Sequence, residues 1–336
     1  METVKLGVVG LGWVSQVVHL PLLTRLPDAQ VVAVCDRLRD RARLVSEKYG
    51  IGKYYTDIDD LLAREDIAAV IICTPTDQHK TGVLKSVAAG KDVLVEKPIA
   101  PTYKDTIEID EAVRRSKRKV MVGMNQRFRP DTMILKSFIE GKELGEIFYT
   151  RIGWLRKRST EAGWTTQKEK AGGGVLLDLG IAMIDLAFWM MGFPKATRVR
   201  ATHFNHTTKE VEDTALISIT TQTGSVISVD VSWSMLMKDD VYSCHMFGTD
   251  GTASLSPLSI VKSLHGNLVN VAPTKLDPPE RLFKRSYENE IRHFLAAVRG
   301  VHPVISTATE AVHRMMIVDA AYKSARLGKE VALSAQ

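Results

Sequence analysis

A glycine-rich turn close to the N-terminus constrains the fold of this chain more than any other feature. Residues 4–9 form a short apolar run of strand type, and the motif Gly10-Leu11-Gly12-Trp13-Val14-Ser15 follows it and opens a helical pattern. Gly10 permits a tight turn, Gly12 lets the backbone approach a pyrophosphate, and Ser15 is nearly as small as the usual third glycine. The helix N-terminus offers N–H donors to phosphates. Because glycine turns are common, the motif predicts a dinucleotide site at Gly10, Gly12, Trp13 and Val14 only if its surroundings agree.

The surroundings agree, because strand and helix patterns alternate through the first third of the chain. Continuous Val, Ile and Leu runs are typical of strands buried on both faces of a parallel sheet, and such units build a doubly wound α/β domain. The expected strands are 4–9, 31–35, 68–72, 92–95 and 120–123, and the expected helices are 13–26, 37–49, 78–89 and 103–116. We therefore predict an N-terminal Rossmann domain over residues 1–124, with Pro21 as a kink in its first helix.

The pattern changes after residue 124, where apolar and polar residues begin to alternate. A turn at Thr223-Gly224 precedes such an alternation, which predicts a hairpin with one apolar face. The apolar positions are Ile227, Val229, Val231 and Trp233. Helical patterns at 287–299 and 308–326 close the chain. We predict a C-terminal α+β domain over residues 125–336, built on a large, mostly antiparallel sheet.

Charge and cysteine usage argue against several classes of protein. Lys and Arg number 45 against 39 Asp and Glu, a net charge of +6, but the basic residues are interleaved with acidic ones. The densest basic run, residues 114–119, ends an expected helix, where cations complement the helix dipole, so we expect no nucleic-acid partner. Three cysteines without CxxC spacing argue against a disulfide framework and a zinc site. We expect no metal and a reducing, cytoplasmic compartment.

Neither a membrane span nor a signal segment is expected. The longest apolar stretch, residues 175–191, carries two Asp residues and is too short and too polar to cross a bilayer. The N-terminus lacks the basic and then apolar pattern of a signal peptide. We therefore expect no contact with a membrane.

Asp36 ends the second expected strand, 24 residues after Gly12, close to the offset of about 20 residues at which a carboxylate reads the ribose of a dinucleotide. A carboxylate there accepts both adenosine-ribose hydroxyls and repels a 2′-phosphate, which favours NAD. Arg37 leaves NADP open, because its guanidinium can stack on adenine or pair with that phosphate. The alternative for Arg37 is a solvated helix start.

Two further loops follow buried strands, at the edge of the sheet where ligands of such domains bind. The first contains Thr74, Pro75 and His79, and the second is Glu96-Lys97-Pro98. Solubility poorly explains a lysine between a buried strand and a proline. Partial burial would lower the pKa of Lys97 and suit it to proton transfer; the alternative is a surface lysine at a strand end.

Taken in order, these motifs make the chain resemble the Gfo/Idh/MocA oxidoreductases over essentially its whole length. The resemblance rests on Gly10-Leu11-Gly12, Asp36, Thr74-Pro75 with His79, Glu96-Lys97-Pro98, residues 123–128 (Gly-Met-Asn-Gln-Arg-Phe) and Gly172-Gly173-Gly174 leading into Asp178. It implies an NAD(P)-binding Rossmann domain and a C-terminal domain whose open sheet carries substrate contacts and builds a homodimer or homotetramer. It also implies that Lys97, after which the peptide bond is often cis, lies near the nicotinamide and the reacting hydroxyl. The cofactor-site residues that the resemblance adds are Thr74, Pro75, His79, Glu96, Lys97 and Asn125.

The segment after the three glycines is apolar nearly all round, so we expect a buried helix there. Asp178 and Asp185 lie two turns apart on one face, and buried carboxylates are costly unless they are hydrogen-bonded or lie in a polar pocket. In the family, a substrate-facing Asp is followed four residues later by a catalytic His. The resemblance thus makes Asp178 a catalytic residue, but Ala182 stands where that His is expected. Asp185 is also a catalytic candidate, with structural hydrogen bonding as the alternative.

Ala182 leaves three interpretations open. Lys97 transfers the proton directly with help from Asp178, another side chain replaces the histidine, or the chain binds cofactor without turnover. The candidate replacements are His203, His206, His245 and a tyrosine.

Two weaker matches concern aromatic residues. Trp164 lies fourteen residues before Asp178, like a tryptophan that closes over the nicotinamide in some relatives, but Thr165 replaces the arginine that usually follows it. Tyr287 resembles a tyrosine close to the cofactor in the same relatives. An ordinary place in the core explains each of them equally well.

These observations predict an NAD(P)-dependent dehydrogenase or reductase that acts on CH–OH groups of a small molecule. The expected substrate is a carbohydrate, polyol or related hydroxy or keto compound, with Lys97 as acid/base. One alternative is an NAD-dependent glycosidase that oxidises its sugar transiently. The other is a non-catalytic cofactor-binding regulator, which the retention of Lys97 and Asp178 argues against.

Overall fold

The structure, a computed structural model, describes residues 3–157 and 163–333 and divides into two compact units. Unit 1 comprises Met1–Met124 and Tyr287–His313, and unit 2 comprises Asn125–Ser286 and Arg314–Gln336. The first break falls where the sequence changes pattern, whereas Tyr287–His313 groups with unit 1 rather than with the C-terminal region. Within unit 1, Lys119 Nζ donates a hydrogen bond to Val298 O at 3.0 Å, which fixes part of that segment.

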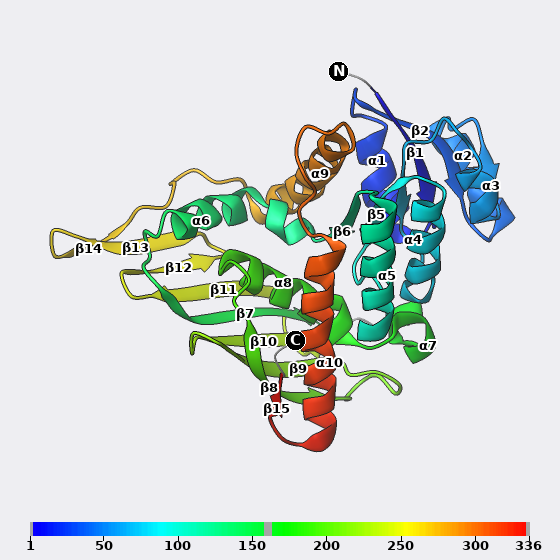
Figure 1. Cartoon of the computed structure of the whole chain (residues 1–336). Coiled ribbons are helices and arrows are strands. Elements are labelled where there is room, and N and C mark those ends of the chain that lie inside the picture. The colour runs from blue at the N-terminus through cyan, green and yellow to red at the C-terminus, as the bar shows by residue number, and fades with distance from the viewer. Residues whose placement is uncertain (1–2, 158–162, 334–336) are drawn as a thin grey trace. The chain divides into compact units, whose positions relative to one another are not determined.

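Unit 1 is built on a six-stranded sheet in the order β3-β2-β1-β4-β5-β6, in which all neighbours are parallel (Figure 1). The strands are β1 (Val4–Val9), β2 (Ala29–Cys35), β3 (Tyr54–Tyr55), β4 (Ala69–Ile72), β5 (Asp92–Glu96) and β6 (Val120–Gly123). This order reverses between β1 and β4, and ligands of doubly wound sheets bind at such a switch point. The expected Rossmann arrangement is confirmed.

The helices of unit 1 follow the expected pattern with one correction. The elements are η1 (Ser15–His19), α1 (Leu20–Leu23), α2 (Arg39–Tyr49), α3 (Ile58–Leu62), η2 (Thr76–Gln78), α4 (His79–Ala88) and α5 (Tyr103–Ser116); α9 (Pro279–Val298) and α10 (Ala308–Leu327) each belong partly to this unit. The helix expected over 13–26 is present as one continuous helical segment over residues 13–23, but its middle, η1, is a π-helical turn rather than regular α-helix. Pro21 occupies the first turn of α1, where a missing N–H costs little.

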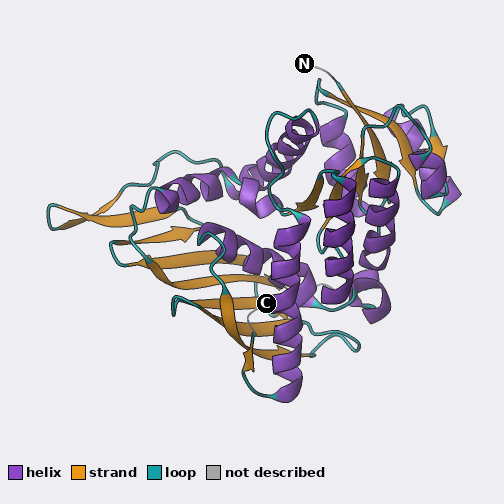
Figure 2. Cartoon of the chain, viewed as in Figure 1, coloured by secondary structure: helices purple, strands orange, loops and turns teal. Residues whose placement is uncertain are grey.

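Unit 2 is built on a nine-stranded sheet in the order β14-β13-β12-β11-β7-β10-β9-β8-β15, labelled in Figure 1 and drawn in orange in Figure 2. Its strands are β7 (Ile147–Lys157), β8 (Ala196–Phe204), β9 (Thr214–Thr221), β10 (Val226–Met235), β11 (Val241–Gly248), β12 (Gly251–Leu255), β13 (Ser259–Leu264), β14 (Asn267–Asn270) and β15 (Val331–Ala332). The pair β7–β10 is parallel and the other described pairs are antiparallel. The hairpin expected around Thr223-Gly224 is confirmed as β9–β10.

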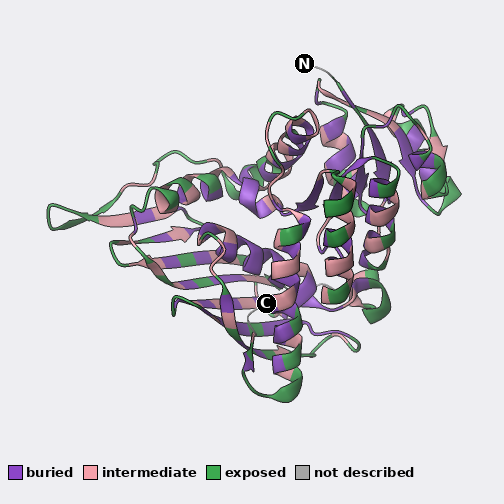
Figure 3. Ribbon diagram, viewed as in Figure 1, coloured by how far each residue is buried: buried purple, intermediate pink, exposed green. Residues whose placement is uncertain are grey.

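The core of unit 2 lies between this sheet and one long helical segment. That segment consists of η5 (Leu176–Gly180, a π-helical turn) and α8 (Ile181–Met190), and it contacts β7 and β10. Ile227, Val229 and Val231 are fully buried, and Figure 3 shows the burial along the sheet. Residues 168–190 are long and apolar enough to pass as a membrane span, but 89% of their most apolar window is buried, as in a core helix. The other short helices of unit 2 are η3 (Asn125–Phe128), α6 (Pro130–Glu140), η4 (Trp164–Thr166) and α7 (Lys168–Ala171).

Candidate active site

The glycine motif at the end of β1 is shaped by the loop that follows β4. Gly10 has a φ of +85°, and a Cβ there would lie 2.6 Å from the backbone N of Thr74. A side chain is therefore excluded at Gly10 by both backbone conformation and space. A Cβ at Gly12 would meet no protein atom within 4 Å, so packing does not require that glycine. Close approach of a pyrophosphate to the backbone does require it.

Ser15 fits the third position of the motif because its hydroxyl has a partner. The side chain is buried, and Oγ donates a hydrogen bond to the carbonyl oxygen of Gly10. The hydroxyl thus reinforces the turn that a third glycine would merely permit. Trp13 is 69% exposed and Val14 is half-buried, so both lie at the accessible side of the turn.

Asp36 lies where the adenosine of the cofactor is expected, and its carboxylate accepts three hydrogen bonds. Its Oδ2 accepts a hydrogen bond from Leu11 N at 2.9 Å, and its Oδ1 accepts bonds from Leu38 N at 2.9 Å and from Arg41 Nη2 at 3.0 Å. One carboxylate therefore ties the glycine loop to the start of α2. Arg41 lies in the first turn of α2, and no motif had marked it.

A cavity of about 570 Å³ opens at the carboxyl ends of β1, β2 and β4. The residues around it that bear on a cofactor are Gly10, Asp36, Arg37, Arg41, Thr74 and Pro75. These side chains supply a carboxylate for ribose hydroxyls and guanidinium groups for adenine or phosphate, beside a glycine turn open to a pyrophosphate. The residues present therefore fit the adenosine and phosphate part of NAD.

His79 links the two loops that were expected to meet the cofactor. The ring is 1% exposed; Nδ1 lies 2.7 Å from Pro98 O, and Nε2 lies 2.8 Å from Thr74 O. Burial lowers the pKa of His79, and the two carbonyl oxygens only partly offset this effect. A neutral imidazole donates through one nitrogen, so the ring donates to one of these loops at a time and packs against the other. His79 therefore braces the two loops.

The loop that carries Lys97 has a second brace, which sequence reasoning missed. His19, in the π-helical turn after the glycine motif, places Nε2 2.7 Å from Glu96 Oε1. Burial alone would lower the pKa of His19, but the neighbouring Cys73 and Glu96 raise it well above its usual range. Burial likewise opposes the charge on Glu96, but the hydrogen bond from His19 and the charge of Lys97 lower the pKa of Glu96. An ion pair thus lies directly beside the half-buried Lys97. No sequence signal pointed to it, because the direction of the His19 side chain depends on the π-helical turn, and such a turn has no recognisable sequence pattern.

The remaining cofactor-side candidates fall in different places. Tyr287 belongs to unit 1 and meets His19 edge-to-face, with ring centroids 5.9 Å apart. The Lys97–Pro98 peptide bond is cis, as the resemblance implies. Asn125 belongs to unit 2, where Nδ2 donates a hydrogen bond to Ser286 Oγ at 2.9 Å. Trp164 also belongs to unit 2 and is 39% exposed.

Asp178 lies in the π-helical turn of unit 2 and faces the sheet. Its Oδ2 accepts a hydrogen bond from the indole Nε1 of Trp233 at 3.2 Å. Both side chains are half-buried, whereas their neighbours in η5 and β10 are buried. Trp233 therefore donates a hydrogen bond to Asp178 as well as lying on the apolar face of the hairpin. π-Turns inside helices occur often at functional sites, which agrees with the role expected of Asp178.

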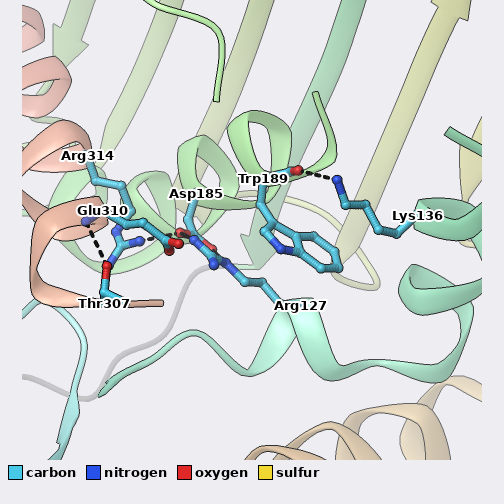
Figure 4. A network of polar contacts seen from close by, with 7 residues as sticks. All are labelled: Arg127, Lys136, Asp185, Trp189, Thr307, Glu310 and Arg314. Carbon is cyan, nitrogen blue, oxygen red and sulfur yellow. Dashed lines mark hydrogen bonds and ion pairs between the residues drawn. The ribbon is translucent and has the colours of Figure 1, made fainter. Parts of the chain in front are cut away.

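Asp185 has a different environment, shown in Figure 4. It is fully buried, accepts two hydrogen bonds from Arg127, at 2.8 and 2.6 Å, and accepts a third from Arg314 Nη1 at 2.7 Å. A carboxylate between two buried guanidinium groups is well placed to join η3, α8 and α10. This geometry favours the structural alternative for Asp185, and a catalytic role for it stays a prediction.

The three histidines that could replace the missing one lie at different places on or beside the nine-stranded sheet of unit 2. Ala182 is buried in α8. His245 alternates with the buried Cys244 and Met246 on β11, so it projects from the face opposite to η5 and α8. His206 follows the end of β8, and its ring stacks on that of Phe204. His203 is on the helix-covered face, but it packs edge-to-face on Tyr322, and burial lowers its pKa to about 4.

Metal binding finds no support in the described ranges, 3–157 and 163–333. No group of three or more His, Cys, Asp or Glu residues there is arranged to hold a metal ion. The three cysteines are free and buried.

Comparison with known proteins identifies two parts of one family along the chain. Residues 4–124 match the oxidoreductase family domain with an NAD-binding Rossmann fold, and residues 136–333 match the C-terminal alpha/beta domain of the same family. D-Glucoside 3-dehydrogenase of Escherichia coli (strain K12) is 28% identical over 98% of this chain and 97% of its own length. scyllo-Inositol 2-dehydrogenase (NAD(+)) of Bacillus subtilis (strain 168) is also 28% identical, over 98% of this chain and 96% of its own.

Solved structures show the same arrangement. GenD2 from gentamicin A biosynthesis, in complex with NAD, superposes with a TM-score of 0.87 at 26% identity and covers 100% of this chain and 97% of its own. Levoglucosan dehydrogenase in complex with NADH and L-sorbose superposes with a TM-score of 0.89 over the whole of both chains, and at 20% identity it shares the fold.

Proposed function

Since the chain belongs to the Gfo/Idh/MocA family of NAD-dependent oxidoreductases that act on CH–OH groups, we propose that it interconverts a secondary alcohol and a ketone on a sugar or polyol. Relatives along its whole length are named for glucoside and inositol dehydrogenation. The polar groups of Asp178 and Trp233 suit a substrate rich in hydroxyl groups, because a carboxylate accepts hydrogen bonds from hydroxyls.

The observation that carries the proposal is the bracing of Lys97. Glu96 before it is paired with His19, and Pro98 after it meets His79. One buried histidine thus holds the side chain of the residue before the lysine, and another contacts the backbone of the residue after it. A lysine needed only for solubility would not require this support.

In the proposed reaction, bound NAD supplies the hydride acceptor. Lys97 in its uncharged form accepts at Nζ the proton of the hydroxyl that is being oxidised, and it returns a proton there in the reverse direction. Asp178 accepts a hydrogen bond from a substrate hydroxyl and orients the ring, with Trp233 holding the carboxylate. His79 and His19 keep the lysine loop in place and exchange no proton with the substrate.

A dehydrogenase screen over sugars, inositols and sugar acids, with both cofactors and NAD(P)H absorbance as readout, tests the proposal. We expect net NADH formation on at least one of them. Release of free sugar from a glycoside without net NADH would identify the glycosidase instead. NAD binding without turnover of any member would identify the regulator, for which the absence of the histidine at Ala182 is the motivating observation.

On a confirmed substrate, Lys97→Met tests the assigned acid/base. We expect turnover to fall about 10²–10⁴-fold, the usual contribution of a general acid–base group, while NAD affinity stays nearly unchanged. Lys85→Met is the matched control, because Lys85 is also a half-buried lysine of unit 1 and pairs with Asp59. Wild-type turnover in Lys97→Met would remove Lys97 from the mechanism.

A further inference from the structure

The N-terminus of the helical segment that carries Asp178 is held by two residues that no motif marks, the buried Glu212 and the half-buried Tyr322. We propose that Glu212 and Tyr322 are positioning residues that fix this segment and thereby hold Asp178 in place for the substrate. The inference rests on the proposed function of Asp178. All the residues involved belong to unit 2.

Glu212, which lies just before β9, caps the start of η5. Its Oε1 accepts hydrogen bonds from Gly174 N and Leu176 N, both at 3.0 Å, and Oε2 lies 3.1 Å from Gly174 N. The backbone oxygen of Glu212 accepts a further bond from Val175 N at 2.9 Å. Three consecutive N–H groups that have no partner inside the helical segment are thus satisfied by one residue. A carboxylate at this end also complements the helix dipole.

Tyr322 of α10 completes the cap. Its hydroxyl donates a hydrogen bond to Glu212 Oε1 at 2.9 Å, so this oxygen has three donors. Glu212 is 6% exposed. Burial and the neighbouring carboxylate raise the pKa of Tyr322 well above its usual range, so the hydroxyl stays protonated and keeps donating. Burial also raises the pKa of Glu212, against the effect of its hydrogen bonds.

The two residues explain why the segment begins with glycines. A Cβ at Gly174 would lie 1.9 Å from the backbone oxygen of Glu212, and one at Gly173 would lie 2.0 Å from the hydroxyl oxygen of Tyr322. Side chains are therefore excluded at the positions where the cap approaches most closely. The glycines at 173 and 174 are therefore the sequence feature that corresponds to the contact with Glu212 and Tyr322.

The cap is one hydrogen-bonded turn away from Asp178. The backbone N of Asp178 donates to Gly174 O at 3.1 Å, and Gly174 is the residue that Glu212 holds. At the other end, the carboxylate of Asp178 is held by Trp233. A shift of the first turn therefore moves Asp178 relative to the strand that orients it, and a misplacement of about 1 Å can cost about 10²-fold in rate.

Three variants test the inference. Glu212→Met keeps the length of the side chain and removes both acceptors, and we expect kcat to fall about 10- to 100-fold. Glu212→Gln keeps an oxygen for the Leu176 and Tyr322 donors, so it should restore most of the activity. Glu210→Met is the control, because Glu210 is exposed in the same loop and borders the same cavity of about 620 Å³ as Glu212.

Two readouts besides activity separate positioning from general loss of structure. Hydrogen exchange of peptides that contain residues 173–178 should be faster in Glu212→Met than in Glu212→Gln. NAD affinity should be unchanged in both, because the dinucleotide residues belong to unit 1. If Glu212→Met does not fold, Tyr322→Phe provides the same comparison, with a smaller loss of kcat and faster exchange in the same segment.

The outcomes distinguish this inference from the proposed function. If Asp178→Asn loses turnover while Glu212→Met and Tyr322→Phe keep wild-type kcat, the positioning role is wrong and the site stands. If Asp178→Asn keeps wild-type turnover, the proposed role of Asp178 fails, and the positioning role falls with it. Loss of NAD affinity in Glu212→Met equal to its loss of kcat would indicate general unfolding and would also overturn the inference.

Discussion

We expect Asp36 and Arg41 to determine together whether the dinucleotide cavity accepts the 2′-phosphate of NADP. Asp36 presents a charge that a 2′-phosphate would meet, so we expect NAD to bind more tightly than NADP. Arg41 offsets that charge through its 3.0 Å contact with Asp36 Oδ1, although the Arg41 side chain is 40% exposed. The exposure limits the strength of the pair, because exposed ion pairs contribute little. The sequence pointed to Arg37, but the residue in contact with the carboxylate is Arg41.

Arg41→Met should therefore raise the preference for NAD. Without the guanidinium, the 2′-phosphate of NADP meets an unshielded carboxylate, and we expect NADP affinity to fall about 2- to 5-fold, the range of an exposed ion pair. NAD affinity should change little, and calorimetric titration of both cofactors measures the ratio. Arg43→Met, on the same helix and paired with Glu47, is the control. Tighter binding of NADP than NAD by the unmodified protein would overturn the role of Asp36.

The His19–Glu96 pair predicts a pH dependence of stability. The pKa of His19 is raised on folding, so its contribution is complete below the unfolded value of about 6.5 and is lost as the pH rises through the folded value. The pKa of Glu96 is lowered, so its contribution is present above about 4.3 and is lost as the pH falls through the folded value. The pair therefore stabilises unit 1 most between these two limits.

His19→Gln should lower the free energy of unfolding by about 3 kcal/mol in that window, the usual effect of removing one partner of a buried pair. The difference from the unmodified protein should shrink at alkaline pH, where His19 loses its proton. Urea unfolding at a series of pH values measures it. A difference that stays constant from pH 5 to pH 10 would show that the charges of the pair contribute nothing.

At the level of elements, we expect Asp185 to anchor α8 rather than to take part in catalysis. Its carboxylate joins Arg127 of η3 to Arg314 of α10. Asp185→Asn keeps the shape but removes the charge that both buried guanidinium groups contact, and we expect a loss of about 3–5 kcal/mol in unfolding free energy. Turnover per folded molecule should change little at a temperature where the variant is folded. A kcat loss equal to that of Asp178→Asn, with unchanged stability, would instead favour the catalytic interpretation.

The elements also show what periodicity reveals and what it hides. Helix α5 occupies the expected residues, 103–116, because Thr102 caps it and its buried residues repeat with helical spacing. The turns η1 and η5 are π-helical, and one inserted residue in a turn leaves no sign in an apolar pattern. Both turns carry residues of the site, His19 and Asp178. Sequence reasoning therefore located the helices, but not the local geometry that directs these side chains.

At the level of the whole chain, the parts that the sequence predicts are those fixed by local patterns. Unit 1 follows from buried strands and glycine turns, and the hairpin β9–β10 follows from alternation. The assignment of Tyr287–His313 to unit 1 depends on contacts between residues far apart in the chain, and no local pattern encodes them. The same holds for Glu212 and Tyr322, because the contact of Glu212 with Gly174 spans 38 residues and its contact with Tyr322 spans 110.

The nine-stranded sheet leads to a prediction for the assembly, which we propose to be a homodimer or homotetramer. Ile227, Val229 and Val231 are buried on the side of η5 and α8, so Tyr149 and Phe247, of opposite parity on adjacent strands, project from the other face. Their rings stack there with centroids 5.5 Å apart.

Arg151 and His245 are exposed beside these rings, on the same face of the sheet. Stacked aromatic rings amid polar residues on a broad sheet face are typical of a surface that is covered by another protein chain. Light scattering should therefore show a multiple of the chain mass of 37.3 kDa at micromolar concentration. Phe247→Asp should shift the protein towards the single chain, because a carboxylate buried against a second sheet lacks a partner. Leu268→Asp, at an 81% exposed position on β14, should leave the mass unchanged. A 37.3 kDa species in the unmodified protein would reject the assembly, and dissociation by Leu268→Asp alone would move the contact to the β13–β14 hairpin.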